Sequence, residues 1–131
     1  MIPSLLIANR GEIARRIIRT ARRLGVCAIA VYSEADSGAP FVCEADAAVL
    51  IGPPPAAQSY LLGAEILRAA RETGAAAIHP GYGFLSENAD FAQAVIDAGL
   101  VWVGPPPLSI RAMGLKDAAS RLQDSSASRK C

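Results

Sequence analysis

A glycine joins a helical pattern to a short apolar run in the stretch Leu24-Gly25-Val26-Cys27-Ala28-Ile29-Ala30-Val31-Tyr32. The same order recurs at Thr73-Gly74-Ala75 and at Ala98-Gly99-Leu100, each of which leads into a further apolar run. Glycine suits the left-handed residue just past a helix, and a continuous apolar run suits a strand buried on both faces. Helix, glycine and strand in repetition are typical of a parallel sheet. The sequence therefore predicts an α/β fold.

On either side of these three stretches, the apolar periodicity predicts the remaining elements. Apolar residues at helical spacing predict helices over residues 12–24, 59–73 and 88–98. Ser59 is expected to cap the second helix, and Asn88 or Ser86 the third. Cys27 lies inside an apolar run and is expected to be buried. Short apolar runs predict strands at 5–8, 27–32, 47–51, 76–79 and 101–103. We expect one domain over residues 1–114 and a polar, serine-rich tail over 115–131.

The bulk composition excludes several classes of protein. The chain has 131 residues, of which 52% are apolar, and its formal net charge is +1. This balance indicates a core-forming domain and favours neither nucleic acid nor a membrane surface as a partner. The three cysteines lack metal-ligand spacing, and no apolar run reaches the length of a membrane span. No signal peptide is recognisable at the N-terminus, so a cytoplasmic location is the expectation.

Charge is concentrated at the start of the chain. The first 23 residues hold six arginines against a single acid, Glu12. The arginine-rich helix has three interpretations: a solvated face, a protein interface or a nucleic-acid surface. The last is the weakest because no aromatic residues alternate with the arginines. The carboxylate pairs Glu34/Asp36 and Glu44/Asp46 are expected to be solvated rather than catalytic.

The most unusual segment is His79-Pro80-Gly81-Tyr82-Gly83-Phe84-Leu85-Ser86-Glu87-Asn88. It follows a predicted strand and precedes a predicted helix, which is where ligands bind in open α/β sheets. Tyr82 offers a flat face and a hydroxyl, and the glycines allow close approach of the backbone to a ligand. His79 is the chain's single histidine, so we expect a packing role rather than a catalytic one. After the first strand only Gly11 matches a dinucleotide fingerprint, which disfavours an NAD site. We assign no catalytic or metal-binding residue.

Three motifs resemble the N-terminal domain of the biotin carboxylase family. They are Ile7-Ala8-Asn9-Arg10-Gly11-Glu12-Ile13-Ala14, the segment from Ala77 to Asn88, and Ile110-Arg111-Ala112-Met113-Gly114 followed by Lys116. The resemblance runs from about residue 3 to 119. It implies the pre-ATP-grasp fold, a Rossmann-like parallel sheet flanked by helices. It also implies the family's ligase reaction, in which protein-linked biotin is carboxylated with bicarbonate and MgATP.

The resemblance implies roles for five residues. Tyr82 and the backbone of Gly83 match positions that line the biotin site, and Lys116 matches a contact with the ATP phosphates. Arg16 and Arg19 match positions in the family's homodimer interface. The cofactors of the family are ATP, Mg2+ and biotin. Its partners are the biotin carboxyl carrier domain and the carboxyltransferase, and the final carboxyl acceptor is chosen elsewhere.

After Lys116 the sequence departs from the family pattern and enters the serine-rich tail. In the family the ATP-grasp domains, which hold the magnesium ligands and the catalytic arginine, follow at this point. We therefore expect a truncated chain that is inactive alone. Two alternatives stay open: a stand-alone dimerisation or interaction module, and a nucleotide-binding Rossmann-like domain.

Overall fold

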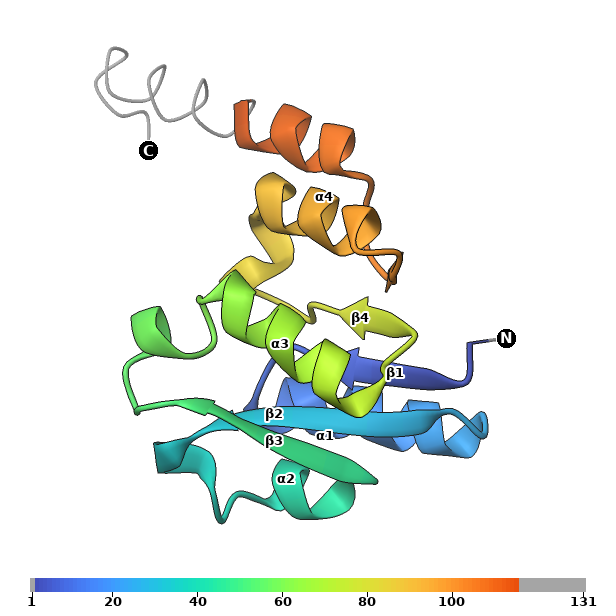
Figure 1. The fold of residues 1–131 in the computed structure, drawn as a ribbon, viewed down its shortest axis with the longest axis vertical. Coiled ribbons are helices and arrows are strands. Elements are labelled where there is room, and N and C mark those ends of the chain that lie inside the picture. Colours follow the sequence, from blue (N-terminus) through green and yellow to red (C-terminus); the bar gives the residue numbers. More distant parts are fainter. Residues whose placement is uncertain (1, 116–131) are drawn as a thin grey trace, which may run out of the picture.

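The computed structural model describes residues 2–115, which form a five-stranded, wholly parallel sheet with the order β3-β2-β1-β4-β5. This arrangement confirms the α/β fold and the parallel sheet predicted from the sequence (Figure 1). The strands are β1 (Ser4–Ile7), β2 (Cys27–Ser33), β3 (Ala47–Gly52), β4 (Ala77–His79) and β5 (Val101–Trp102).

Helices cover both faces of the sheet. They are α1 (Gly11–Arg23), α2 (Pro40–Glu44), α3 (Gly63–Thr73) and α4 (Ala89–Asp97), with a further helix over residues 107–115. Three single 3-10 turns are η1 (Glu34–Asp36), η2 (Ala56–Gln58) and η3 (Phe84–Glu87). α3 lies in front of the sheet and α1 behind it (Figure 1).

Strand β1 separates the two halves of the core. Leu5 and Ile7 belong to the cluster formed with α1 and α2, whereas Leu6 and Ala8 belong to the cluster formed with α3 and α4. Successive side chains of a strand point to opposite faces, so a strand covered on both sides needs apolar residues throughout. The apolar run at the start of the chain therefore becomes the central strand.

Two local predictions were wrong. α3 begins at Gly63 rather than at 59, because the Ser59 side chain is buried and its hydroxyl donates to the Pro55 carbonyl at 2.9 Å. Cys27 is exposed, since it occupies the first position of β2, at the amino edge of the sheet. The cap predicted for α4 is confirmed: the Asn88 side-chain oxygen accepts a hydrogen bond from the Phe91 N–H at 2.9 Å.

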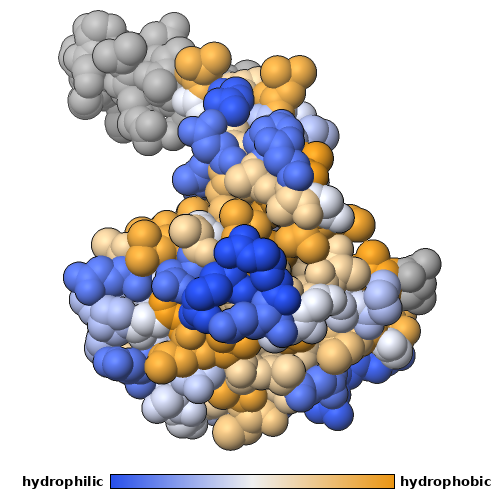
Figure 2. Space-filling view, in the orientation of Figure 1, coloured by the Kyte–Doolittle hydropathy of each residue, from blue (hydrophilic) through white to orange (hydrophobic). Residues whose placement is uncertain are grey.

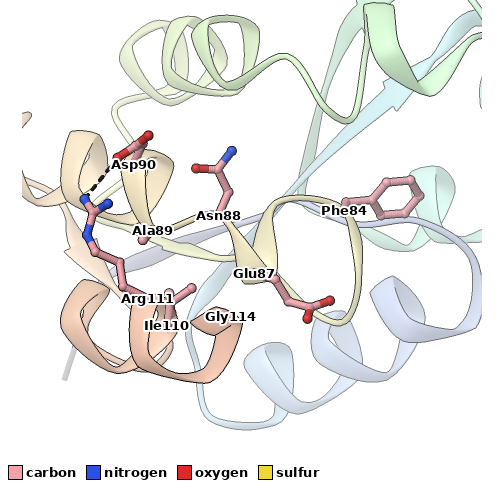
Figure 3. A pocket seen from close by; sticks show the side chains of 8 residues that line it. All are labelled: Phe84, Glu87, Asn88, Ala89, Asp90, Ile110, Arg111 and Gly114. Atoms are coloured by element: carbon pink, nitrogen blue, oxygen red, sulfur yellow. Dashed lines mark hydrogen bonds and ion pairs between the residues drawn. The ribbon is translucent and has the colours of Figure 1, made fainter. Parts of the chain in front are cut away.

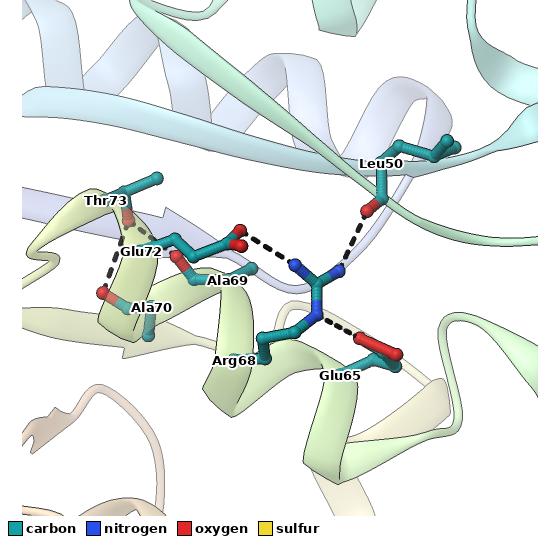
Figure 4. A network of polar contacts seen from close by, with 7 residues as sticks. All are labelled: Leu50, Glu65, Arg68, Ala69, Ala70, Glu72 and Thr73. Atoms are coloured by element: carbon teal, nitrogen blue, oxygen red, sulfur yellow. Dashed lines mark hydrogen bonds and ion pairs between the residues drawn. The ribbon is translucent and has the colours of Figure 1, made fainter.

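The outer face of α3 is strongly polar (Figure 2). Its central residue, Arg68, donates hydrogen bonds to Glu65 and Glu72 on the same helix and to the Leu50 carbonyl of β3 at 3.1 Å (Figure 4). Arginine's fork of donors can serve several acceptors at once. This side chain therefore ties α3 to the edge strand of the sheet.

The helix over 107–115 packs on α4 through a small apolar cluster. Ile110 is buried against Ala89 and Ala92 of α4, while Leu108, Met113 and Leu115 are exposed. Orange side chains lie apart from one another along the outer edge of this region, with blue side chains between them (Figure 2).

The order of the strands creates a switch point between β1 and β4. From β1 the chain adds β2 and then β3 on one side, and then crosses to place β4 and β5 on the other side of β1. Connections that leave neighbouring strands in opposite directions open a crevice at their carboxyl ends, and ligands bind there in open α/β sheets. Asn9 follows β1 and the 80–84 loop follows β4, so both reach this crevice.

Candidate functional site

The crevice between β1 and β4 holds a buried amide. Asn9 is 1% exposed, and its side-chain nitrogen donates hydrogen bonds to the carbonyls of Pro80 at 2.9 Å and Tyr82 at 2.7 Å. Its side-chain oxygen accepts from the Arg10 N–H at 2.9 Å. The amide therefore joins the residues after β1 to the loop after β4.

The 80–84 loop has an unusual backbone. Gly81 has a φ of +70°, and Gly83 combines a φ of +71° with a ψ of −159°. The non-glycine residue Phe84 also has a positive φ, +46°. Backbone in such regions persists only where its surroundings over-determine it, and it clusters at functional sites. The loop is therefore held in place by its contacts.

Tyr82 and Gly83 form the open face of this loop. Tyr82 is 80% exposed although it lies between two tightly held glycines. The Gly83 N–H donates no hydrogen bond to any residue within 2–115, and an added Cβ at this position would meet nothing within 4 Å. An exposed aromatic face beside a free backbone donor suits a flat, uncharged ring that carries a hydrogen-bond acceptor. These two neighbouring residues are the ones that the resemblance to the family selected, and both lie on the exposed side of the loop.

The His79 side chain holds the same loop through a hydrogen bond. Its Nδ1 accepts a hydrogen bond from the Gly81 N–H at 3.0 Å, so that nitrogen must be unprotonated. The ring is half-buried, and burial lowers the pKa of His79 below its ordinary value. The histidine therefore has the structural role that the sequence favoured.

An ion pair lies at the neighbouring strand ends. The Arg10 guanidinium donates to both carboxylate oxygens of Asp36 at 2.6 Å, and the Tyr60 hydroxyl donates to Asp36 at 2.6 Å. The Asp36 side chain is 8% exposed and that of Arg10 is 49% exposed. The expectation that Asp36 is solvated was wrong, because its two partners come from distant parts of the chain.

The charges of this group shift one another's pKa values. The hydrogen bonds from Arg10 lower the pKa of Asp36, although burial opposes them. Burial and the hydrogen bond to Asp36 raise the pKa of Tyr60 to about 12. Asp36 is therefore ionised and Tyr60 neutral across the physiological range, which is a stable structural arrangement rather than a proton relay.

Tyr60 connects this ion pair to the loop. Its oxygen also accepts from the buried Ser33 N–H at 3.1 Å, and its ring lies 5.3 Å from that of Phe84. Phe84 is the residue that carries the non-glycine positive φ. The far end of the loop therefore rests on a ring that is itself held by the ends of β2 and η1.

The arginine face of α1 has a partner within the chain. Arg15 forms a bidentate pair with Glu44 of α2 at 2.9 and 3.1 Å, and Arg19 lies 3.6 Å from the same carboxylate. Glu44 is thus a partly exposed surface residue, as expected, and is paired with two arginines. Arg16 is exposed and lines an apolar groove with Ile17. The structure therefore separates the two predicted interface residues: Arg19 is shared with α2, whereas Arg16 forms no ion pair within residues 2–115.

A second hollow lies beyond the loop. It is lined by residues of η3, the start of α4 and the helix over 107–115, and Arg111 donates to Asp90 across it at 3.0 Å (Figure 3). It is shallow, and its one arginine pairs with Asp90, one of the two acidic residues in the lining. Lys116, the predicted ATP contact, and the tail over 116–131 lie outside the described residues.

Residues 2–115 hold neither a cluster of metal ligands nor a membrane-spanning helix. Within this range no group of three or more histidine, cysteine or acidic side chains could hold a metal ion. No helix in the same range is both long and apolar enough to cross a bilayer.

Comparison with known proteins links this chain to one family. The model of the family described as "Biotin carboxylase, N-terminal domain" matches residues 1–110. The alpha subunit of rice mitochondrial methylcrotonoyl-CoA carboxylase is 60% identical over 92% of this chain. The propionyl-CoA carboxylase alpha chain of Ruegeria pomeroyi is 53% identical over 93% of it. This chain spans 16% and 18% of the length of these two relatives.

Solved structures agree with the sequence relatives. The biotin carboxylase domain of a single-chain bacterial carboxylase superimposes with a TM-score of 0.84 at 50% identity, over 94% of this chain and 29% of that one. The urea amidolyase of Kluyveromyces lactis superimposes with a TM-score of 0.87 at 45% identity, over 96% of this chain and 8% of that one.

Proposed function

Because this chain belongs to the biotin carboxylase family and matches its N-terminal domain, we propose that Tyr82 and Gly83 form one wall of a biotin site. The site would serve a biotin-dependent carboxylase that carboxylates protein-linked biotin with bicarbonate and MgATP. In that reaction biotin is the carboxyl acceptor. The observation that carries the proposal is the exposed Tyr82 ring beside the free Gly83 N–H at the switch point of the sheet.

The chemistry of this wall fits biotin. The vitamin's head group is a compact, uncharged ring system with a carbonyl oxygen that accepts hydrogen bonds. Tyr82 provides an aromatic surface, and Gly83 provides a backbone donor that is free within residues 2–115, with open space where a Cβ would lie. No charged side chain is needed to hold such a ligand. The residues present orient the head group and leave the transfer chemistry to other parts of the enzyme.

Several further parts of the proposal rest on family membership. They are the contact of Lys116 with ATP, the use of Mg2+, and the biotin carboxyl carrier domain and carboxyltransferase as partners. The division into a domain over 1–114 and a tail over 115–131, and the inactivity of the chain alone, also remain predictions. So does a cytoplasmic location, and the rice relative is named as mitochondrial.

A transplanted domain tests the biotin site. Residues 2–115 would replace the matching residues of the Ruegeria propionyl-CoA carboxylase alpha chain, and biotin-dependent ATP hydrolysis would be measured. We expect Tyr82→Ala to raise the KM for free biotin and leave the KM for ATP unchanged. Tyr82→Phe keeps the flat face and should stay near the parent value. An active transplant in which Tyr82→Ala leaves the KM for biotin unaltered contradicts the proposal.

We also propose that α1 forms a homodimer contact through Arg16 and Arg19. Arg16 lies exposed at the rim of an apolar groove beside Ile17, and arginine is enriched in protein interfaces. Arg19 is half-exposed and keeps donors beyond its contact with Glu44. Sedimentation of the chain at increasing concentration tests this contact. Arg16→Glu should shift the population toward monomer, and a strictly monomeric parent chain would contradict the proposal.

A further inference from the structure

We propose that Asn9 is the positioning residue of the 80–84 loop, and that it sets the orientation in which Tyr82 and Gly83 are presented. This inference rests on the proposed biotin site for its functional meaning. The contact itself is a property of the fold. Asn9 would touch neither substrate nor cofactor and would act entirely through the loop.

The hydrogen bonds of Asn9 explain why this residue type is needed. A primary amide has two N–H donors and one oxygen acceptor, and both ends are used here. The nitrogen serves the carbonyls of Pro80 and Tyr82, and the oxygen serves the Arg10 N–H. Aspartate would lose both donors, and a serine hydroxyl would be too short to serve three partners. The site therefore fits asparagine and leaves little freedom for the side chain.

The two carbonyls held by Asn9 flank one glycine. The Pro80 carbonyl belongs to the peptide unit that precedes Gly81, and the Tyr82 carbonyl to the unit that joins Tyr82 to Gly83, so Asn9 holds the loop at both of these peptide units. A Cβ on Gly81 would lie 2.5 Å from the Asn9 nitrogen, which shows how closely the loop approaches the amide. The direction of the Tyr82 side chain follows from the backbone that this contact holds. Exposure of the ring thus depends on a residue 73 positions earlier in the chain.

Asn9 is anchored to the central strand of the sheet. It follows the central strand, and the Ala8 N–H before it donates to the His79 carbonyl at 2.9 Å. The loop, by contrast, contains Gly81, Gly83 and Phe84 in backbone regions that are strained or reserved for glycine. A side chain anchored in the sheet can keep such a loop in one conformation. Functional groups carried on loops need this kind of support to be held accurately.

The opposite end of the same strand pair provides a matched control. At the amino end, the Ser4 hydroxyl accepts a hydrogen bond from the Ala76 N–H at 2.9 Å, which joins β1 to the start of β4. Ser4→Ala removes a side-chain link between the same two segments without touching the loop. A general loss of stability would follow from either change. Only a change at Asn9 should alter the loop.

The experiment is backbone 15N relaxation of the 131-residue chain and of the variants Asn9→Asp, Asn9→Ala and Ser4→Ala. In the parent chain we expect order parameters near 0.85 for residues 81–83, as in rigid backbone, and slow exchange of the Asn9 amide protons. In both Asn9 variants the order parameters of the loop should fall below about 0.6, while those of β1 and β4 stay high. Ser4→Ala should lower the melting temperature and leave the loop unchanged.

Three results would overturn the proposal. They are a flexible loop in the parent chain, an ordered loop in both Asn9 variants, and an equal loss of order in Ser4→Ala. Should the Asn9 variants fail to fold, Gly81→Ala perturbs the same contact from the loop side and must also loosen residues 82–83. The transplanted carboxylase separates the two proposals. An ordered loop together with a KM for biotin that Tyr82→Ala leaves unaltered contradicts the biotin site and leaves the role of Asn9 intact.

Discussion

The carboxyl ends of the strands, where Asn9 and Asp36 lie, and the arginine face of α1 are both rich in polar contacts, but they differ in burial. Asn9 and Asp36 are buried, and each has several hydrogen-bond partners from separate segments. Glu44 also has several partners, yet the side chains of Glu44 and Arg15 are each 31% exposed and that of Arg19 is 50% exposed. Removing one partner from a buried group leaves the others without water to replace it. Exposed ion pairs lose little because solvent and salt screen them.

The largest expected loss of stability comes from substituting Asp36. Asp36→Ala leaves the half-exposed Arg10 guanidinium and the buried Tyr60 hydroxyl without their acceptor. Because water can reach Arg10, the loss in the free energy of unfolding should be smaller than for a fully buried pair, at about 2 kcal/mol. Urea unfolding followed by Trp102, the chain's single tryptophan, measures this loss. A loss no larger than that of Glu44→Gln would remove the distinction between the two regions.

The same pair predicts a dependence on acid. The pKa of Asp36 is lowered in the folded chain, so its contribution is present above its unfolded pKa of about 3.9 and disappears as pH falls through the folded value. The difference in unfolding free energy between the parent chain and Asp36→Asn should therefore be constant at neutral pH and shrink below about pH 4. A difference that persists at lower pH would contradict the ion pair as its source.

The second-largest expected loss of stability comes from substituting Gly83. The combination of φ +71° and ψ −159° is essentially restricted to glycine, although space for a Cβ is open. Gly83→Ala should therefore lower the free energy of unfolding by about 1–2 kcal/mol through backbone strain alone. Gly38→Ala is the matched control, because that glycine also has open space but no positive φ. Equal losses for the two variants would contradict the strained loop.

A smaller, pH-dependent loss of stability is expected from protonation of His79. Its pKa is lowered in the folded chain, so the unfolded chain takes up the proton first, and stability falls as pH drops below about 6.5. Protonation removes the acceptor of the Gly81 N–H, which is worth about 1 kcal/mol for a neutral hydrogen bond. His79→Gln should abolish the change between pH 7.5 and 5.5, since the chain has no other histidine. A pH dependence retained in that variant would assign it to another group.

The smallest effect is expected at Glu44. Glu44→Gln weakens the pairs with Arg15 and Arg19, but these charges lie on the surface. Any loss in stability should vanish at 1 M salt, where the screening length is about 3 Å. A large loss that survives high salt would show that the arginine face contributes to the fold in the same way as the buried crevice.

These contrasts mark what could be predicted from the sequence. The strands and the helix ends at Gly25, Gly74 and Gly99 were predictable because they depend on local apolar runs and on left-handed glycines. The prediction of a biotin site at Tyr82 and Gly83 likewise came from the family motif in one continuous segment. In both cases the signal lies within a few neighbouring residues.

The supporting contacts were not predictable in the same way. Asn9 and Asp36 find their partners 24 to 73 positions away, and no local pattern reports such pairs. Ser59 resembles a helix cap in sequence, but tertiary packing buries its side chain, and α3 begins only at Gly63. Asn9 lies in the family motif from Ile7 to Ala14, directly after the predicted first strand. That position was the one sequence feature that indicated its role.

The most direct test compares the two regions within one working enzyme. The transplanted carboxylase would carry either Asn9→Asp or Glu44→Gln, and the KM for free biotin and for ATP would be measured for each. We expect Asn9→Asp to raise the KM for biotin several-fold at an unchanged KM for ATP, and Glu44→Gln to alter neither. Equal values of the KM for biotin in both variants would contradict a biotin-facing loop that is held in place by the buried amide.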